Sequence, residues 1–258
     1  MGLDLSNPAH LTGMKIAQLI GAVCSFILPA HLYAVLTTDD YKKYLQLITV
    51  PKINSLVLGA LAILAGMPLI NWMAELNSSL SLPAFLNGLE NAMKEGEEQM
   101  KELTEAFLKM NNTADLGINL FIIGFIAAFS EELLFRGAIQ KSLFEWTGNK
   151  HKAIWISAAL FSFIHFQFYG FLPRMMMGAM LGYVYMWTGS IWVPVFTHFV
   201  NNGAAVLLSY YEQKNIIPKE IENIGSSSEE FTYVVISIIL VTGLLWTLFL
   251  QQKKHHEG

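Results

Sequence analysis

The sequence predicts an all-α protein, a polytopic bundle of transmembrane helices. Its 258 residues are 53% hydrophobic and only 14% charged, whereas about 25% of the residues in a soluble domain are charged. The mean hydropathy is +0.43. Apolar segments recur along the chain, and most approach the roughly 20 residues that a helix needs to cross a bilayer. We therefore expect one integral-membrane domain over residues 1–258, embedded in a lipid bilayer.

The apolar segments define the expected spans. They cover residues 16–36, 56–76, 116–139, 154–171, 175–187, 191–210 and 231–250. The fifth segment is short and the third is long, so we expect about seven spans, within a range of six to eight.

The distribution of lysines indicates the orientation of the bundle. Three groups fall on the same side of a seven-span bundle: Lys42, Lys43 and Lys52; Lys141, Lys150 and Lys152; Lys253 and Lys254. Because cytoplasmic loops are enriched in basic residues, we expect the C-terminus in the cytoplasm and the N-terminus outside.

Residues 78–113, between the second and third spans, predict an acidic amphipathic helix outside the membrane. Apolar residues recur at helical spacing from Phe85 to Phe107, and six glutamates occupy other positions: Glu90, Glu95, Glu97, Glu98, Glu102 and Glu105. Helices that lie on a membrane surface usually have a basic polar face. We therefore expect this helix to pack over the protein's own spans, or to form a surface for a partner or substrate, rather than to bind lipid.

Charge and cysteine content exclude some functions. The net charge is −4 and no basic tract is present, so a nucleic acid is not an expected partner. Cys24 is the single cysteine, which rules out a disulfide within this chain and a metal cluster of cysteines. Nothing in the sequence indicates an oligomeric state.

The third predicted span contains three ionisable residues, Glu131, Glu132 and Arg136. Ionisable groups in or beside hydrocarbon are costly, and they indicate function by default. On a helix Glu132 and Arg136 share a face, while Glu131 points about 100° away. We interpret Glu132 and Arg136 as a structural ion pair, and Glu131 as a spare acid available for chemistry.

Two further spans contribute polar groups. His165 follows Phe161 by one helical turn in the fourth span, and His198 and Asn202 share a face of the sixth. Phe161 is expected to fix the His165 ring or to keep water scarce. The set suits attack by water on a carbonyl: Glu131 would act as general base, His165 would orient the water, and His198 with Asn202 would bind the oxyanion.

Each polar residue also has a purely structural interpretation. A single buried histidine or asparagine in a membrane usually forms a hydrogen bond between helices. A chain of buried Glu and His residues could also relay protons in a proton-coupled transporter, although no internal repeat supports that interpretation. A third possibility is a non-catalytic immunity or scaffold protein with the same fold.

The ordered motifs Glu-Glu-x-x-x-Arg, Phe-x-x-x-His and His-x-x-x-Asn, each predicted on an apolar helix, resemble the CAAX protease and bacteriocin-processing (abortive-infection) family of intramembrane proteases. This family includes the type II CAAX prenyl endopeptidases. The resemblance covers about residues 130–202, within an expected catalytic core of residues 114–210. It implies hydrolysis of a peptide bond in a membrane-associated or prenylated protein or peptide, in a bacterial plasma membrane, by Glu131 and His165 with His198 and Asn202.

The family has been described both as metalloproteases and as metal-independent glutamate proteases. A catalytic zinc normally has three protein ligands, which here would be Glu131, His165 and His198. No free carboxylate would then remain as base, because Glu132 is paired with Arg136, and asparagine is a poor zinc ligand. We therefore favour a mechanism without a cofactor, with zinc as the alternative.

Overall fold

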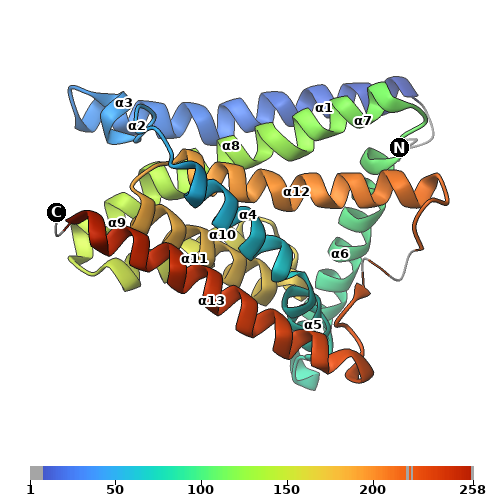
Figure 1. Ribbon diagram of the computed structural model, residues 1–258. Helices are drawn as coiled ribbons and strands as arrows, with labels where there is room; N and C mark the ends of the chain where they lie inside the picture. The colour runs from blue at the N-terminus through green and yellow to red at the C-terminus, as the bar shows by residue number, and fades with distance from the viewer. Residues whose placement is uncertain (1–7, 219–220, 222, 257–258) are drawn as a thin grey trace.

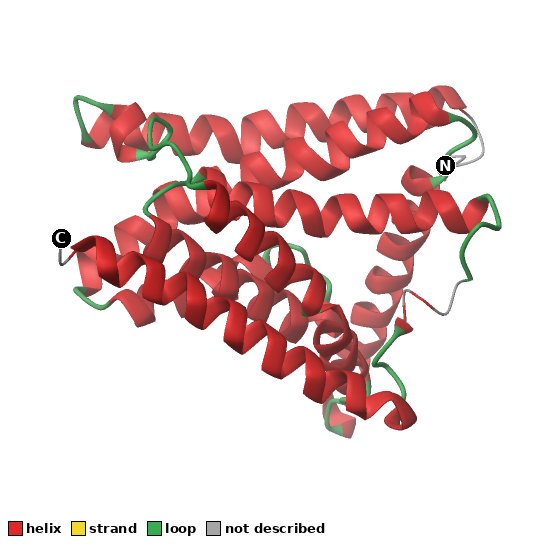
Figure 2. Cartoon of the chain, in the orientation of Figure 1, coloured by secondary structure: helices red, strands yellow, loops and turns green. Residues whose placement is uncertain are grey.

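The computed structural model describes residues 8–218, 221 and 223–256. Every regular element in this part of the chain is a helix (Figure 2), which confirms the predicted all-α class. The helices lie mostly side by side (Figure 1), and α1 begins at the end of the bundle opposite to the end where α13 finishes.

Each predicted span corresponds to helical structure. The first is the continuous helix formed by α1 (Pro8–Ala22), η1 (Val23–Ile27) and α2 (Leu28–Thr37). The second is α4 (Ile53–Ala65) with α5 (Met67–Ser78), and the third runs through α7 (Thr113–Asn119), η3 (Leu120–Ile126), α8 (Ala127–Glu132), η4 (Leu133–Gln140) and α9 (Lys141–Thr147). The remaining four correspond to α10 (Lys150–Phe163), α11 (Phe171–Thr188), α12 (Trp192–Gln213) and α13 (Phe231–His256). The short elements α3 (Tyr41–Tyr44), η2 (Ala84–Leu86), η5 (Phe168–Gly170) and η7 (Ser228–Glu230) lie in the connections.

Within the described residues, three helices are long and apolar enough to cross a membrane by length and composition alone. They are Ala9–Thr37, Thr113–Thr147 and Phe231–Gln251. The pair α4 and α5, bent by 43° at Gly66, raises the number to as many as four. The predicted spans that correspond to α10, α11 and α12 are shorter or more polar than these helices. A total of seven spans therefore stays a prediction.

The fourth predicted span, 154–171, is wrong at its C-terminal end. Helix α10 ends at Phe163, and α11 already begins at Phe171. Between them the chain turns sharply, with Phe166 at a positive φ of 52°. Pro173 accounts for part of this break, because proline is tolerated in the first turn of a new helix but would interrupt a continuing one. His165 therefore lies in a turn and not within a helix.

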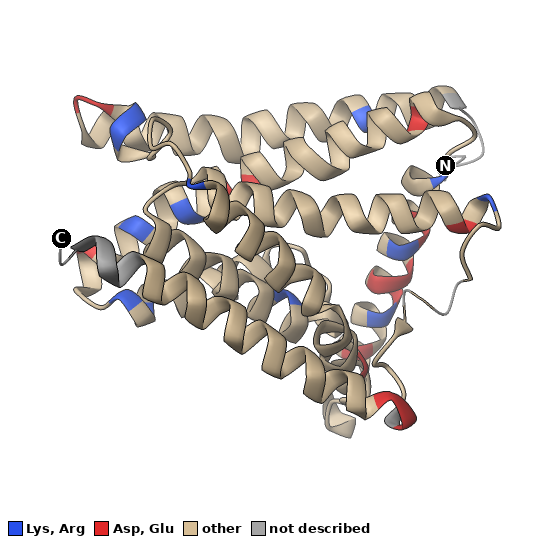
Figure 3. Ribbon diagram, viewed as in Figure 1, with Lys and Arg blue, Asp and Glu red and all other residues tan. Residues whose placement is uncertain are grey.

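The acidic helix is present as α6 (Asn87–Leu108). Figure 1 shows it running across the end of the bundle, next to the C-terminal part of α12. Helix α6 carries both acidic and basic residues, with the acidic ones more numerous, while basic residues of α3, α9 and α10 lie toward the opposite end (Figure 3). It also contacts α1 and η5, so it packs over the protein's own helices. Its position relative to a membrane stays a prediction.

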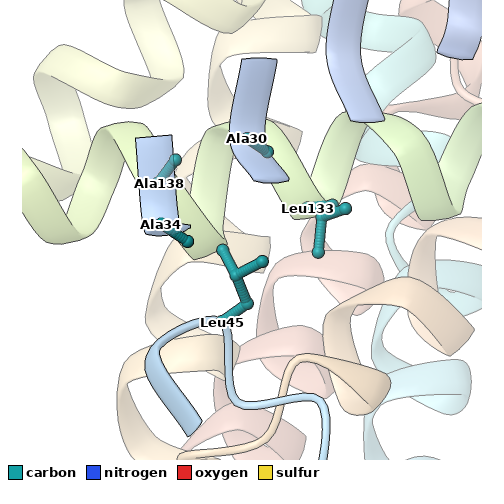
Figure 4. Packing of buried hydrophobic residues seen from close by; sticks show 5 residues of the cluster. All are labelled: Ala30, Ala34, Leu45, Leu133 and Ala138. Carbon is teal, nitrogen blue, oxygen red and sulfur yellow. The ribbon is translucent and has the colours of Figure 1, made fainter. Parts of the chain in front are cut away.

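A small apolar cluster fixes the third span against the first. Ala30 and Ala34 of α2 meet Leu133 and Ala138 of η4, and Leu45 closes the cluster from the following loop (Figure 4). All five side chains are almost completely buried. Alanines let the two helices approach closely, as small residues do at helix interfaces in membranes. This contact holds η4 in place directly after the two glutamates.

Candidate active site

Both glutamates lie on α8, a short α-helical segment between two π-helical segments, η3 and η4. π-Helical turns within a longer helix are rare and frequently occur at functional sites. The whole of Thr113–Thr147 nevertheless remains one helix. Glu131 and Glu132 are thereby held in its middle, where they face α12.

Glu132 is the centre of a buried charge network. Its Oε2 lies 3.0 Å from Nε of Arg136, and neither side chain is exposed to solvent. Its Oε1 accepts a hydrogen bond from Nδ1 of His198 on α12, at 2.9 Å. The structural pairing inferred from the spacing of Glu132 and Arg136 is thus present in the structure, with His198 as a third member.

Arg136 connects this network to α10 and α11. Its Nη2 donates to the carbonyl oxygen of Gly178 at 3.1 Å, and its guanidinium lies 5.3 Å from the ring centre of Phe161. A cation over an aromatic face is favourable, and more so when it is desolvated. A Cβ atom on Gly178 would lie 3.2 Å from Phe161 and 3.3 Å from Ala158, so glycine permits this close packing of the two helices.

Among the described residues, Glu131 has only His198 as a basic partner within salt-bridge distance. Its Oε2 lies 3.8 Å from Nε2 of His198, and its side chain retains 16% exposure. That separation is too long for a direct hydrogen bond, but a single water molecule is able to bridge such a gap. His198 therefore stands between the two carboxylates, bonded to one and facing the other.

His165 approaches the same cluster through Phe161. Its Nδ1 lies 2.8 Å from the carbonyl oxygen of Phe161. A carbonyl only accepts, so Nδ1 donates and Nε2 is left as the acceptor in the neutral ring. The Phe161 ring stands edge-on to His165 at 5.1 Å and to His198 at 5.9 Å. Phe161 thus packs against both imidazoles, and its expected role in fixing the His165 ring stays a prediction.

Asn202 lies one turn beyond His198 on α12, but its side chain contacts a different helix. Its Nδ2 donates to the carbonyl oxygen of Ile123 in η3 at 3.2 Å, and its Oδ1 accepts from Asn201. The structure therefore gives Asn202 a bond between helices. One N–H of its amide is not used by this bond, and the predicted oxyanion role stays a prediction.

A zinc ion fits the predicted ligands poorly. Among the described residues, no group of three or more His, Cys, Asp or Glu side chains lies close enough together to hold a metal ion. His165 and His198 each bond through Nδ1 and leave Nε2 free, an arrangement that metal-binding histidines also use. The metal dependence of the protein therefore stays a prediction, and we assign no chemical step to a metal.

Two residues that sequence reasoning missed hold the turn containing His165. Asn77 of α5 donates to the carbonyl oxygen of Phe168 at 2.8 Å and accepts from the backbone N–H of Leu172 at 2.9 Å. Arg174 of α11 donates to both the backbone and the side-chain oxygen of Gln167. An arginine within an apolar run was a readable signal, whereas nothing around Asn77 distinguishes it in the sequence.

Part of the chain is similar to a known protein family. Residues 113–204 match the model of a family described as "Type II CAAX prenyl endopeptidase Rce1-like". This region contains every predicted site residue, so the resemblance inferred from the three motifs is confirmed. The chain is a helical membrane protein whose residues 113–204 are similar to this family.

Two curated proteins of Bacillus subtilis (strain 168) are similar to parts of the chain. "Putative membrane peptidase YdiL" is 29% identical over 119 residues, which cover 46% of this chain and 48% of that protein. "Uncharacterized protein YpbD" is 29% identical over 86 residues, 32% of this chain and 41% of that protein. The matches thus span less than half of each relative. No solved structure matches the chain.

Proposed function

We propose that the protein is an intramembrane endopeptidase that hydrolyses a peptide bond of a membrane-associated substrate. The observation that carries this proposal is that two adjacent carboxylates differ in burial and in their partners. Glu132 is fully buried between Arg136 and His198, whereas Glu131 is partly exposed and faces Nε2 of His198 across 3.8 Å. One acid holds the site together, and the other is free to move a proton.

In the proposed reaction, Glu131 accepts a proton from a water molecule as the water oxygen attacks the substrate carbonyl carbon. The carbonyl π electrons move to oxygen and form a tetrahedral oxyanion. Glu131 then passes the proton to the amide nitrogen, the C–N bond breaks, and the products are a carboxylic acid and an amine. Atoms and charge balance without any further reactant.

His198 is suited to stabilise the oxyanion. Its Nδ1–H donates to Glu132, which fixes the ring so that Nε2 is directed toward the Glu131 side. With a proton on Nε2 as well, His198 would donate to the developing negative charge, an interaction worth about 3 to 4 kcal/mol in a dry site. We assign His165 to orienting the water through Nε2, and Asn202 to a second donor through its remaining N–H.

For the substrate, the matching family favours the C-terminal tail of a prenylated, CAAX-type protein. A core embedded in the bilayer would suit a lipid-anchored substrate, which would approach within the bilayer. Other membrane-associated proteins and peptides also contain peptide bonds that could be hydrolysed. The test must therefore not assume one substrate sequence.

The test compares wild-type protein with Glu131→Gln in cells, by mass spectrometry of new peptide termini in the membrane proteome. Glutamine keeps the size of the side chain but cannot accept the proton, so we expect product termini to fall by about a thousandfold or more. Thermal stability of the purified variant controls for folding. Equal product from both proteins would refute the protease, and proton-linked flux without product would favour a transporter.

A further inference from the structure

A groove of about 270 Å³ opens beside Glu131, on the side of the first span. It lies between α1 with η1 on one wall and η3 with α8 on the other. Its polar side chains are Gln18, Ser25, Ser130 and Glu131, and Gly21 leaves room at its floor. One wall therefore comes from outside residues 113–204, the region that matches the known family.

Gln18 lines the groove together with Glu131 and has a side-chain oxygen that lacks a partner among the described residues. Its Oε1 is buried and accepts no hydrogen bond from any described residue. A buried amide oxygen without a donor is costly in free energy, and such groups are uncommon in native structures unless they have a role. Ser130 cannot satisfy it in the present arrangement, because its hydroxyl donates to the carbonyl oxygen of Ala127. The groove thus holds an acceptor that lacks a donor.

We propose, on the basis of the protease function above, that this groove binds the substrate segment next to the scissile bond. Gln18 Oε1 accepts a backbone N–H of that segment. An extended peptide offers such donors at every residue, independently of its sequence, whereas a lipid chain offers none. A peptide in the groove would also lie beside Glu131, which is the geometry that water attack on its carbonyl requires.

The chain offers a matched pair of positions to test this groove. Gly21 lines it, whereas Gly13 lies two turns earlier on α1, outside it. A Cβ atom added at either position meets no heavy atom within 4 Å, so both sites accept a side chain without a clash. Gly21→Leu and Gly13→Leu therefore change helix propensity alike, but only Gly21→Leu fills the groove.

We expect Gly21→Leu to lower the rate at which product termini appear in the membrane proteome by about tenfold or more, and Gly13→Leu to stay within about twofold of wild type. Cleavage by Gly21→Leu at the rate of Gly13→Leu would overturn the groove while leaving the protease intact. Absence of product from wild type would instead overturn the protease, and the groove assignment with it.

The hydrogen bond is tested separately with Gln18→Met, which keeps side-chain length and removes the acceptor. Gln46→Met is its control, because Gln46 Oε1 is also buried without a partner but lines another cavity with Gln140 and Tyr185. We expect about a fivefold loss of product with Gln18→Met and none with Gln46→Met. Equal rates for the two variants would refute the contact.

Binding is measured without catalysis by placing p-benzoylphenylalanine at position 21 or 13 of the Glu131→Gln protein. After irradiation in native membranes, we expect position 21 to capture peptides that contain the cleavage sites found with wild type, and position 13 to capture none of them. Capture of lipid alone, or of the same peptides at both positions, would overturn the proposal.

Discussion

At the scale of single residues, the site depends on how a buried carboxylate, guanidinium and imidazole are paired. Glu132 contacts Arg136 and His198 within 3.0 Å, and all three side chains are almost fully buried. Desolvating such charges is costly, so the network contributes little net stability as a whole, but breaking it leaves an uncompensated charge. Its main contribution is to fix the positions of His198 and Arg136.

This balance predicts a difference between single and double substitutions. Arg136→Met should lower the free energy of unfolding by about 3 to 5 kcal/mol, because Glu132 loses its guanidinium partner. Adding Glu132→Gln should recover part of this loss, since the neutral amide retains an acceptor for His198. Chemical unfolding in detergent micelles measures both variants. Additive losses in the double variant would show that the two residues are not coupled.

The role proposed for Glu131 leads to a second prediction, which concerns the metal dependence of the cleavage rate. If Glu131 itself moves the proton, the cleavage rate should survive exhaustive dialysis against a chelator. The purified protein and the membranes that contain the substrate are each dialysed against the chelator. The metal-free protein is then added to the metal-free membranes, and the cleavage rate is measured. Loss of cleavage that zinc alone restores would contradict the metal-free mechanism.

The sequence predicted residue contacts within one helix well and contacts between helices poorly. Spacing alone predicted the pairing of Glu132 with Arg136, because the i, i+4 relation survives in the structure. The same rule placed His198 and Asn202 on one face, yet His198 binds Glu132 and Asn202 binds Ile123. Which neighbouring helix each side chain meets depends on how α8, η3 and α12 pack, which no local pattern records.

At the scale of elements, the main surprises are breaks and distortions within helices. Apolar length alone extended the fourth span across His165, but the chain turns after Phe163 and is held there by Asn77 and Arg174. The amino-acid sequence contains no pattern that predicts the π-helical segments on both sides of α8. These irregularities gather around the candidate site, where a regular helix would aim the side chains differently.

The start of α6 gives a prediction on pH. The Glu90 carboxylate accepts from Nζ of Lys94 at 2.7 Å and from the backbone N–H of Leu82 at 3.0 Å. The hydrogen bond from Lys94 and the one from Leu82 lower the pKa of Glu90 below its usual value. Its contribution to stability is therefore present above the ordinary glutamate pKa and is lost as the pH falls through the lowered value.

We therefore expect the connection before α6 to become sensitive to limited proteolysis as the pH falls below about 4, the ordinary range of a glutamate. Glu90→Gln should make the same connection sensitive already at neutral pH, while the exposed neighbour Glu98→Gln should not. An acid-active protease measures the first effect. Equal cleavage of the two variants at neutral pH would refute the role of Glu90.

At the scale of the whole molecule, charge is distributed along the axis of the bundle. Basic residues of α3, α9 and α10 lie toward one end, and α6, in which acidic residues outnumber basic ones, crosses the other end, where α1 also carries a basic residue and another directly follows α12 (Figure 3). The positive-inside rule then places α6 outside the cell and the end of α13 in the cytoplasm. This orientation stays a prediction until it is measured.

Cys24 is the single cysteine of the chain, so a Cys24→Ser background makes a direct test possible. A new cysteine at the exposed Glu98 of α6, or at the exposed Lys152 at the start of α10, reports each end of the bundle. In intact cells a membrane-impermeant maleimide should label Glu98→Cys and should label Lys152→Cys only after the membrane is opened. The reverse pattern would invert the orientation, and labelling of both in intact cells would contradict a membrane crossing by Thr113–Thr147, which lies between the two positions. With the predicted labelling pattern, Glu131 would lie between an acidic outer face and a basic inner face. The basic inner face would then attract a substrate tail with a terminal carboxylate from the cytoplasmic side.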